Sequence, residues 1–289
     1  LALLWCLAIG GFALAGNYWL ALSLLAMAGF LNLAFSAMAQ TLVQLIVRNL
    51  YERTADVRWW ATDTSLWDAL QSPTDDKLNF ATQRLGVINK FYSVYHNLIL
   101  TNTEGVVAAV ANPAYHNLIG KDLSSEKWFN MGRATSSGDE YIVDDVRICP
   151  HHANREVLVY ATGVRAGGAA TGELLGVLGV YFDWQDQGRT IVVKEPTLNE
   201  TDWQRTQVLL LDGQHRIIAT TGQHPLGSSF ALACNGNTKG NYYDGQGNIV
   251  AYAKTIGYQE YDGLGWWSVI IQGLDNEDAI RTSLAAPTK

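Results

Sequence analysis

The sequence predicts an α+β protein in which a transmembrane segment and a long N-terminal helix precede two antiparallel-sheet modules in tandem. Three observations lead to this prediction. The N-terminal run is apolar and uncharged, the stretch after it has apolar residues at helical spacing, and one strand–turn–strand pattern occurs twice in the remainder.

The repeat is the strongest of these observations. Residues 98–109 and 208–219 each contain an apolar segment, a polar turn opened by Asn or Asp, and a second apolar segment, which is the pattern of a β-hairpin. A chance resemblance between hairpins would explain one match but not four in order, and two copies are too few for a solenoid. The three later matches, in the same order along the chain, pair 118–123 with 225–230, 159–161 with 251–253, and 178–184 with 264–270.

The first 47 residues contain no Asp, Glu, Lys, Arg or His. About 20 apolar residues suffice for a transmembrane helix, so two arrangements fit: a span near 18–40 preceded by part of another, or one long tilted segment. We favour a transmembrane region over 1–40 with its span at 18–40 and with Tyr18 and Trp19 at the membrane interface. A buried core helix would not need so many uncharged residues, and a cleaved signal peptide would be shorter and would begin with basic residues.

The charge and the cysteines narrow the class of protein. The formal net charge of −7 and the pI near 5.3 argue against binding to nucleic acid or to anionic lipid surfaces. Cys149 and Cys234 fall in different repeats, so we expect no disulfide between them. The chain begins with Leu rather than Met, which suggests a fragment of a longer protein.

Two helices are expected over residues 41–94, between the membrane and the first sheet. Apolar residues at helical spacing predict one long stalk helix out of the bilayer to about residue 70. The segment 72–76 then supplies a cap, a proline and two acidic residues, which start a second helix. We expect Trp59, Trp60 and Trp67 to pack against the sheets rather than to form a ligand cage. The apolar positions are Ile46, Leu50, Val57, Trp60, Ala61 and Trp67 in the first helix and Leu78, Ala81, Leu85, Ile88 and Phe91 in the second.

The two modules follow. The first, 95–205, is expected to contain a hairpin, a short helix that carries Trp128, and three further strands. The second, 206–289, is smaller, has glycine-rich turns, and ends in a strand at 266–272 and the start of an exit helix near 275–286. The strands expected in the first module are at 97–112 (as the hairpin), 140–148, 156–165 and 173–184.

The segment 118–129, LIGKDLSSEKWF, resembles the Gly-x-Asp, short helix and Arg-x-Trp-Tyr stretch of the double Cache sensor domain of bacterial transmembrane receptors, and 141–145 and 176–180 resemble later strands of that family. The resemblance covers about 41–286. It implies two PAS-like Cache modules, with a small-molecule site in the module far from the membrane, 95–205. It also implies a sensing region without catalysis of its own, in the periplasm or outside the cell, anchored in the bacterial inner membrane. The output of such receptors is chemotaxis signalling, a histidine kinase or a cyclic-dinucleotide enzyme.

This chain departs from the family's amino-acid-binding pattern. Glu126 stands where those members have the arginine that pairs with the ligand's carboxylate, and Phe129 replaces the usual tyrosine. The family's acidic residue for the ligand's amine aligns with Tyr181. Asp183 lies two positions further along the same strand and therefore on the same face. An ordinary α-amino acid is thus not the expected ligand.

Eight residues are candidates for ligand contact. Trp128 can stack on a planar ring or hold a cation, although a core role is the alternative. Asp183 needs a partner in its apolar strand, either an internal arginine or the ligand, and Arg147 could instead pair internally with Asp145 or Asp183. Tyr160 could serve the core or the pocket, and strand parity places Tyr141, Asp145 and Arg147 on one face. The full set is Trp128, Phe129, Tyr141, Asp145, Arg147, Tyr160, Tyr181 and Asp183.

Acidic groups beside an aromatic face favour a cation or a nitrogenous ring over an anion. We therefore expect an amine, a quaternary ammonium compound or a nitrogen heterocycle such as a purine. Lys121, Lys127 and Arg147 are the residues that could turn inward and restore anion binding.

The remaining expectations concern metals, catalysis and partners. The segment 149–152, CPHH, contains metal-ligating residue types but lacks evident third and fourth ligands, and no nucleophile elbow, phosphate loop or zinc-protease motif occurs. We expect no metal, no cofactor and no catalytic site. The alternative function is a membrane-anchored periplasmic enzyme or assembly factor that works through its second module. The wide apolar stripe from Ile46 to Trp67 predicts a homodimer along the stalk helix.

Overall fold

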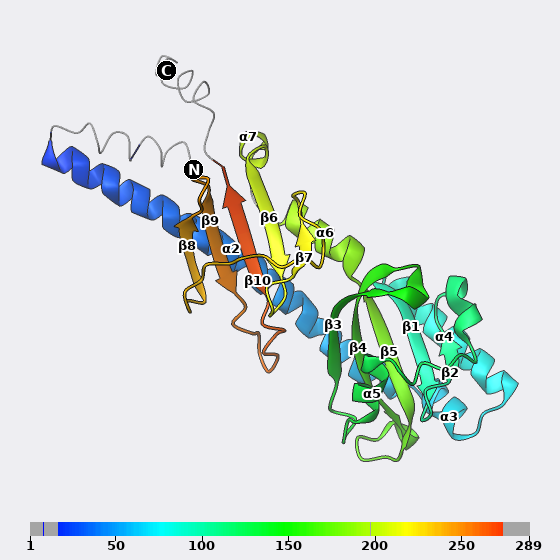
Figure 1. Ribbon diagram of the computed structural model, residues 1–289. Helices are drawn as coiled ribbons and strands as arrows, with labels where there is room; N and C mark the ends of the chain where they lie inside the picture. The colour runs from blue at the N-terminus through cyan, green and yellow to red at the C-terminus, as the bar shows by residue number, and fades with distance from the viewer. Residues whose placement is uncertain (1–7, 9–16, 197, 274–289) are drawn as a thin grey trace. The chain divides into compact units, whose positions relative to one another are not determined.

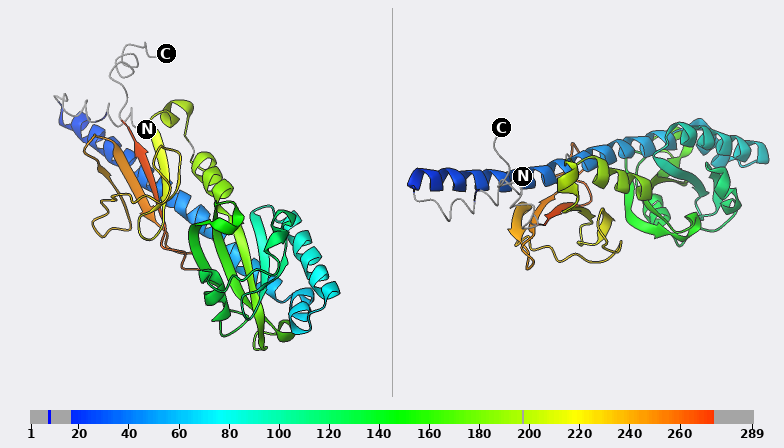
Figure 2. Two further views of the ribbon diagram at one scale, coloured as in Figure 1. Left: turned by 45° about the vertical axis from the view of Figure 1, so that its right-hand side comes forward. Right: turned by 90° about the horizontal axis from the view of Figure 1, so that it is seen from above.

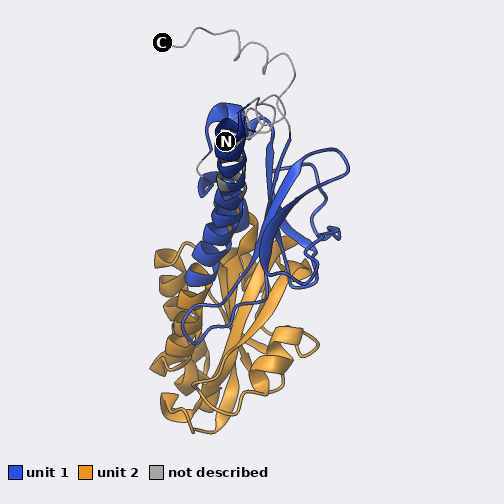
Figure 3. Ribbon diagram, turned by 90° about the vertical axis from the view of Figure 1, so that its left-hand side faces the viewer, with its two compact units in different colours: residues 1–48, 188–289 blue, residues 49–187 orange. Residues whose placement is uncertain are grey.

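The computed structural model describes Ala8, residues 17–196 and residues 198–273. These residues form two compact units: unit 1 comprises residues 1–48 and 188–289, and unit 2 comprises residues 49–187 (Figure 3). The exit helix expected near 275–286 lies outside the described residues.

The N-terminal helix α2 spans Tyr18–Ala61. Asn17 starts it by accepting a hydrogen bond from the backbone N–H of Trp19 at 2.9 Å. The expectation of one helix to about residue 70 is wrong, because the helix is interrupted at Thr62 and Asp63. The Asp63 side chain accepts from the backbone N–H of Ser65 and thereby caps a new helix, α3 (Thr64–Gln71).

The helix expected after residue 72 is present as α4 (Asp75–Phe91). Thr74 caps it, and Asp75 and Asp76 occupy its first turn, where acidic groups complement the helix dipole. Ala81, Leu85 and Ile88 are buried as expected, whereas Phe91 is 76 % exposed. Phe91 therefore does not belong to the buried face.

Unit 2 contains a five-stranded antiparallel sheet in the order β2-β1-β5-β4-β3 (Figure 1). Helices lie along one side of this sheet, and α5 lies over the other (Figures 1 and 2). The strands are β1 (Tyr95–Asn102), β2 (Val107–Val110), β3 (Ile142–Cys149), β4 (Arg155–Arg165) and β5 (Leu174–Asp183). The short helices between them are η1 (Pro113–Leu118), α5 (Lys127–Arg133), η2 (Pro150–His152) and η3 (Ala166–Gly168).

The two faces of this sheet carry different sets of side chains. On β5 the odd-numbered residues face α5: the Trp128 ring lies against Gly179, and Val177 lies against Gly132. The even-numbered residues face the helices, where Phe182 contacts Tyr95. We call the first of these the α5 face. Its apolar core contains Ile99, Val107, Val110, Leu118, Leu123, Trp128, Phe129, Cys149, Val157, Val159, Ala161, Val177 and Tyr181.

Strand β3 has a bulge that sequence parity does not reveal. Asp144 pairs with Val159 and Arg147 pairs with Val157, so the register shifts between them. Directly paired residues of antiparallel strands point to the same side. Asp144 and Arg147 are therefore both on the α5 face, although they are three positions apart.

Unit 1 repeats this architecture. Its five-stranded antiparallel sheet has the order β7-β6-β10-β9-β8, which is the order of the first sheet strand for strand, so the predicted repeat of one sheet module is confirmed. Its strands are β6 (Thr206–Leu211), β7 (Ile217–Thr220), β8 (Lys239–Tyr243), β9 (Ile249–Lys254) and β10 (Trp267–Gln272). Helices α6 (Trp184–Lys194) and α7 (Glu200–Trp203) connect the two sheets in sequence.

The first part of α2 packs on the sheet of unit 1. Phe35, Ala39 and Val43 form a buried cluster with residues of β9 and β10, and Ser268 donates a hydrogen bond to the backbone carbonyl of Ala39. From Phe35 onward, the span expected at 18–40 therefore packs against the sheet of unit 1.

Apolar side chains nearer the start of α2 are uncovered. Tyr18 and Trp19 are 72 % and 73 % exposed, and Leu33 is 70 % exposed. Among the described residues, the stretch Leu33–Ala61 of α2 is long and apolar enough to cross a membrane by length and composition alone. Much of that stretch is buried within the protein, and a helix of a protein core can have the same length and apolar composition.

Candidate functional site

The α5 face of unit 2 carries a row of aromatic rings in van der Waals contact. Trp128 and Tyr181 have ring centroids 5.8 Å apart, and Tyr181 and His152 are 4.5 Å apart. The row continues from His152 to Tyr115 at 4.6 Å and from Tyr115 to His96 at 5.2 Å. It therefore runs from α5 across β5 and η2 to η1 and β1.

Trp128 is fully buried in this row. The helix α5 places it over β5, where a Cβ atom on Gly179 would lie only 2.7 Å from the indole ring. Phe129 beside it is also fully buried, with its ring centroid 6.2 Å from that of Trp128. Both rings thus belong to the packed core of unit 2, so a ligand could reach them only after part of this layer moved.

One end of the row carries a cluster of charges. Arg147 donates to Glu126 Oε2 at 2.5 Å, and its Nε lies 2.9 Å from Asp144 Oδ2. Lys127 Nζ lies 3.0 Å from Asp144, and His151 Nε2 lies 3.2 Å from Glu126 Oε1. Burial opposes the charge on Arg147, but the neighbouring carboxylates of Glu126 and Asp144 outweigh it and raise its pKa.

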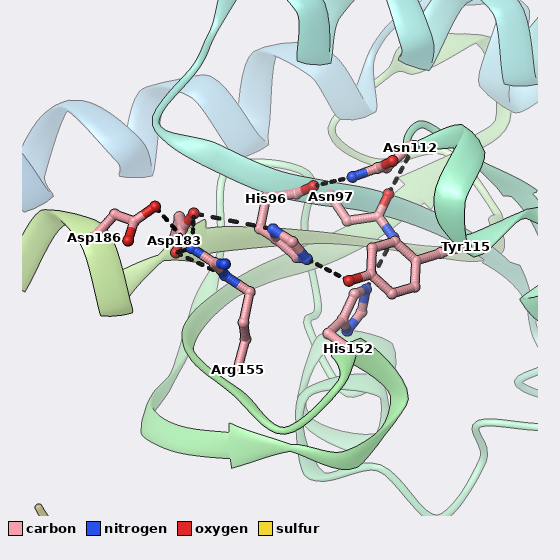
Figure 4. Close-up of polar contacts among 8 residues, drawn as sticks. All are labelled: His96, Asn97, Asn112, Tyr115, His152, Arg155, Asp183 and Asp186. Atoms are coloured by element: carbon pink, nitrogen blue, oxygen red, sulfur yellow. Dashed lines mark hydrogen bonds and ion pairs between the residues drawn. The ribbon is translucent and has the colours of Figure 1, made fainter.

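The other end carries a second charged group (Figure 4). Arg155 Nη2 contacts both carboxylate oxygens of Asp183, at 3.0 and 2.9 Å, and also reaches Asp186 at 2.8 Å. His96 Nδ1 lies 3.9 Å from Asp183, and His96 Nε2 is 2.9 Å from the Tyr115 hydroxyl. Burial lowers the pKa of His96 and the Asp183 charge opposes that effect, with a net lowering.

His152 lies between these two ends and is fully buried. Its Nε2 is 2.9 Å from the side-chain amide nitrogen of Asn97, and its Nδ1 is 3.1 Å from Cys149 Sγ. Burial, together with the positive charges of His96, His151 and Arg147, lowers the pKa of His152 to about 3. Burial likewise raises the pKa of the Cys149 thiol. Both groups are thus neutral at ordinary pH.

Of the eight candidate residues, five lie on the α5 face. Trp128, Phe129, Tyr181 and Arg147 come together at the α5 end of the row. Asp183 lies at the other end, and of the two partners that the sequence left open it has the internal arginine, Arg155. The internal pairing expected for Arg147 has different partners, Glu126 and Asp144 instead of Asp145 or Asp183.

Three candidates lie elsewhere. The hydroxyl of Tyr160 donates to the backbone carbonyl of Leu50 at 3.2 Å, on the opposite side of the sheet. The ring of Tyr141 lies under the guanidinium of Arg58, 5.2 Å from its centroid. Asp145 accepts from the backbone N–H of Val146 and, because of the bulge, does not share a face with Arg147.

Several members of the site are not among the residues that the sequence predicted. Asp144 is absent from the predicted set because strand parity alone assigns Asp145 to the face of Arg147, and Glu126 is absent because it replaces the family's arginine. The histidines of η2 are of a metal-ligating type, but among the described residues no group of three or more His, Cys, Asp or Glu side chains is arranged to hold a metal ion. The other members missed are His96, Asn97, Tyr115 and Arg155.

A groove of about 690 Å³ lies between α3 and α4, on the helical side of unit 2. Its two cations are already paired, Arg84 with Asp63 at 2.7 Å and Lys77 with Asp68 at 2.9 Å. It lacks the row of rings that distinguishes the α5 face. Its lining is Thr62, Asp63, Thr64, Ser65, Asp68, Asp76, Lys77, Phe80 and Arg84.

Comparison with solved structures identifies the fold. The chain is similar to the sensor domain of the Vibrio cholerae histidine kinase DctB, with a TM-score of 0.64 and 12 % identity over 86 % of this chain and 99 % of that one. It is also similar to the ligand-binding domain of the Pseudomonas fluorescens chemoreceptor CtaA in complex with L-serine (TM-score 0.56, 12 % identity, 86 % and 99 % covered). A third similar structure is the ligand-binding domain of the Campylobacter jejuni chemoreceptor Tlp3 in complex with 4-methylisoleucine (0.57, 16 %, 89 % and 93 %). The sequence matches no family model and no curated protein.

The chain therefore shares the fold of these domains, and it has the long N-terminal helix and the two PAS-like modules in tandem that the resemblance to the double Cache family implied. The similar structures are the sensor or extracellular domains of histidine kinases and the ligand-binding domains of chemoreceptors.

Proposed function

We propose that this chain is the extracytoplasmic sensing region of a bacterial transmembrane receptor and that the α5 face of unit 2 binds a small-molecule ligand. The observation that carries the proposal is the row of rings from Trp128 to His96 with a charged group at each end. Buried aromatic surfaces flanked by a few polar groups are typical of small-molecule sites. Similar folds bind L-serine and 4-methylisoleucine.

The proposed ligand is an amine, a quaternary ammonium compound or a nitrogen heterocycle. At the α5 end, two carboxylates, Glu126 and Asp144, contact the half-buried guanidinium of Arg147, and the rings of Trp128 and Tyr181 adjoin them. Of the cations that could favour an anion, Arg147 and Lys127 are both paired with these carboxylates. Carboxylates beside aromatic rings suit a cation.

Binding in this layer would require movement, because the rings are closely packed. The two parts that could yield are α5 and the short turn η2, which together carry Trp128, Phe129 and His152. A ligand that binds the opened arrangement better than the closed one would shift the population between them. This difference in affinity is the physical basis proposed for signalling.

A calorimetric titration of the full chain in lipid nanodiscs tests the ligand class. Choline, a primary amine, adenine and succinate are the probes, and binding is expected for one or more of the first three. Binding of succinate alone would contradict the proposal. Thermal unfolding gives an independent readout, since a ligand at 100 times its dissociation constant adds about 2.7 kcal/mol of stability.

We also propose that the first part of α2, before Phe35, lies in the bacterial inner membrane, with both units in the periplasm or outside the cell. The exposed rings of Tyr18 and Trp19 and the exposed side chain of Leu33 support this placement. A single cysteine at the exposed position of Lys121 should react with a membrane-impermeant maleimide in cells with a permeabilised outer membrane. Reaction only after lysis would contradict this orientation.

A homodimer along α2 is the proposed arrangement of the receptor. The apolar stripe from Ile46 to Trp67, which predicted the dimer, is largely buried within the protein, since Ile46, Leu50 and Val57 are buried. Trp59 does not pack against the sheets as expected but is 67 % exposed, and it is the side chain that supports the contact. Cysteines at the exposed positions of Glu52 and Ala55 should crosslink in membranes, whereas one at Lys121 should not.

A further inference from the structure

We propose that Glu126 is the specificity-determining residue of the α5 face: its carboxylate occupies Arg147 and thereby excludes anionic ligands. This inference rests on the function proposed above and adds to it the group that decides the sign of the ligand's charge. It also predicts that removing one carboxylate converts the face into a site for carboxylates.

The position of Glu126 shows that its side chain is committed to this contact. Glu126 is the N-cap residue of α5, with extended backbone geometry, but its side chain makes no capping hydrogen bond. A carboxylate just before a helix would ordinarily interact with the free backbone N–H groups there. Here it turns instead to strand β3 and to η2, where it meets Arg147 and His151.

Arg147 is engaged on two sides of its guanidinium group. Glu126 Oε2 lies 2.5 Å from Nη2, and Asp144 Oδ2 lies 2.9 Å from Nε. The Glu126 and Asp144 side chains are 14 % and 4 % exposed, so neither carboxylate is freely solvated. An incoming ligand carboxylate would have to displace Glu126 and leave that charge partly buried without its partner, which is unfavourable.

The same arrangement would suit an anion once Glu126 were absent. Asp144 would remain as an ion-pair partner 2.9 Å from Nε of Arg147, a contact without hydrogen-bond geometry, so charge attraction would keep the guanidinium beside it, while the Nη2 donor would lose its partner. Charge-assisted hydrogen bonds from a planar guanidinium are well suited to carboxylates. Trp128 and Tyr181 adjoin this corner, and Tyr181 lies close enough for both Arg147 and Glu126 to perturb its hydroxyl group.

A role of Glu126 in ligand specificity can therefore be distinguished by experiment from a role in fold stability alone. If Glu126 only stabilised the fold, its removal would lower the melting temperature and change nothing else. If it determines specificity, its removal produces a new binding activity that depends on Arg147.

The test uses the full chain in nanodiscs, with acetate and succinate as probes and both calorimetry and thermal unfolding as readouts. Glu126→Ala is expected to bind a carboxylate about tenfold or more tightly than the unsubstituted chain, the range of one charge-assisted hydrogen bond. Glu126→Gln keeps the side-chain shape, covers the case in which the alanine variant fails to fold, and should show the same direction. The double variant Glu126→Ala with Arg147→Met should lose the gain.

Glu140→Ala is the matched control. Glu140 belongs to the same unit, and its carboxylate accepts hydrogen bonds from the backbone N–H and the hydroxyl of Ser136. It should leave carboxylate binding unchanged. The inference is overturned if folded Glu126 variants bind carboxylates no better than the unsubstituted chain, or if the gain persists without Arg147. Amine binding by the unsubstituted chain tests the proposed function separately, so the two can fail independently.

Discussion

Asn97 donates a hydrogen bond from its side-chain amide nitrogen to Nε2 of His152 at 2.9 Å, between residues 55 positions apart in sequence (Figure 4). The amide orientation is fixed, because its oxygen accepts from the backbone N–H groups of Leu98 and Asn112. Nε2 of His152 must therefore act as an acceptor, which places the single imidazole proton on Nδ1, facing the sulfur of Cys149. The histidine is held in one neutral tautomer.

The first prediction is that unit 2 loses stability as the pH falls from about 6.5. In the unfolded chain His152 takes up a proton near pH 6.5, whereas in the folded protein its pKa is lowered to about 3. Between these values the unfolded state binds more protons, so stability decreases by about 1.4 kcal/mol for each unit of pH. Above pH 6.5 this contribution is constant. Thermal unfolding followed between pH 7.5 and 4 measures the slope.

His152→Gln should reduce that slope, while His224→Gln, which alters an exposed histidine of unit 1, should not. Equal slopes in both variants would show that another group is responsible. His96 is expected to add to the slope in the same direction, since its pKa is also lowered.

The second prediction concerns Trp128. Because the ring is fully buried among core residues, Trp128→Ala should lower the free energy of unfolding by about 3–5 kcal/mol. The alanine variant would therefore confuse loss of folding with loss of binding. Trp128→Phe keeps an aromatic ring and is the variant in which ligand affinity should be measured. A stable Trp128→Ala protein would contradict this account of the core.

The third prediction uses the close approach of Trp128 to Gly179. A methyl group at Gly179 would lie 2.7 Å from the indole ring, so Gly179→Ala should destabilise unit 2 by about 1–3 kcal/mol and shift the tryptophan fluorescence. Gly86→Ala is the control: it lies within α4, where a Cβ atom meets a carbonyl oxygen at 3.4 Å. That substitution should be neutral or stabilising, because alanine favours helices. A reversed order of stability would exclude the packing described here.

The fourth prediction is that unit 2 alone holds the ligand. Tyr252 uses its hydroxyl to bind the backbone carbonyl of Cys234, and Tyr243 is partly exposed. Replacing either with Phe should leave affinity within about threefold, or roughly 0.6 kcal/mol. Calorimetry with the best probe measures this, with Trp128→Phe as the comparison. A loss in either tyrosine variant as large as that in Trp128→Phe would assign the ligand to both units.

The sequence was informative where local patterns decide the structure. The hairpin pattern at 98–109 and 208–219 predicted two matching sheets, and the cap and acidic turn at Thr74–Asp76 predicted α4. The Trp128 motif also located the α5 face. These features depend on periodicity and turn chemistry within a few residues.

The rest depends on contacts that sequence periodicity does not encode. The bulge in β3 reverses the parity of the strand, so Asp144 rather than Asp145 meets Arg147. The pairs Glu126–Arg147 and Asn97–His152 join residues from different elements. The stalk helix ends before Asp63 because the side chain of Asp63 caps the next helix, α3. This cap outweighs the apolar periodicity, which continues to Trp67.

The strand order of the two sheets has a consequence for how such modules can be exchanged. In each sheet the first and last strands are neighbours, and their outer residues are paired: Tyr95 with Phe182 in one sheet, and Thr206 with Gln272 in the other. The chain thus enters and leaves each sheet at a single point. A segment whose two ends lie side by side can be removed and replaced as a cassette without stretching the flanking chain. Grafting 95–182 between the helices of a receptor that has this fold should transfer ligand choice while leaving the host's output intact.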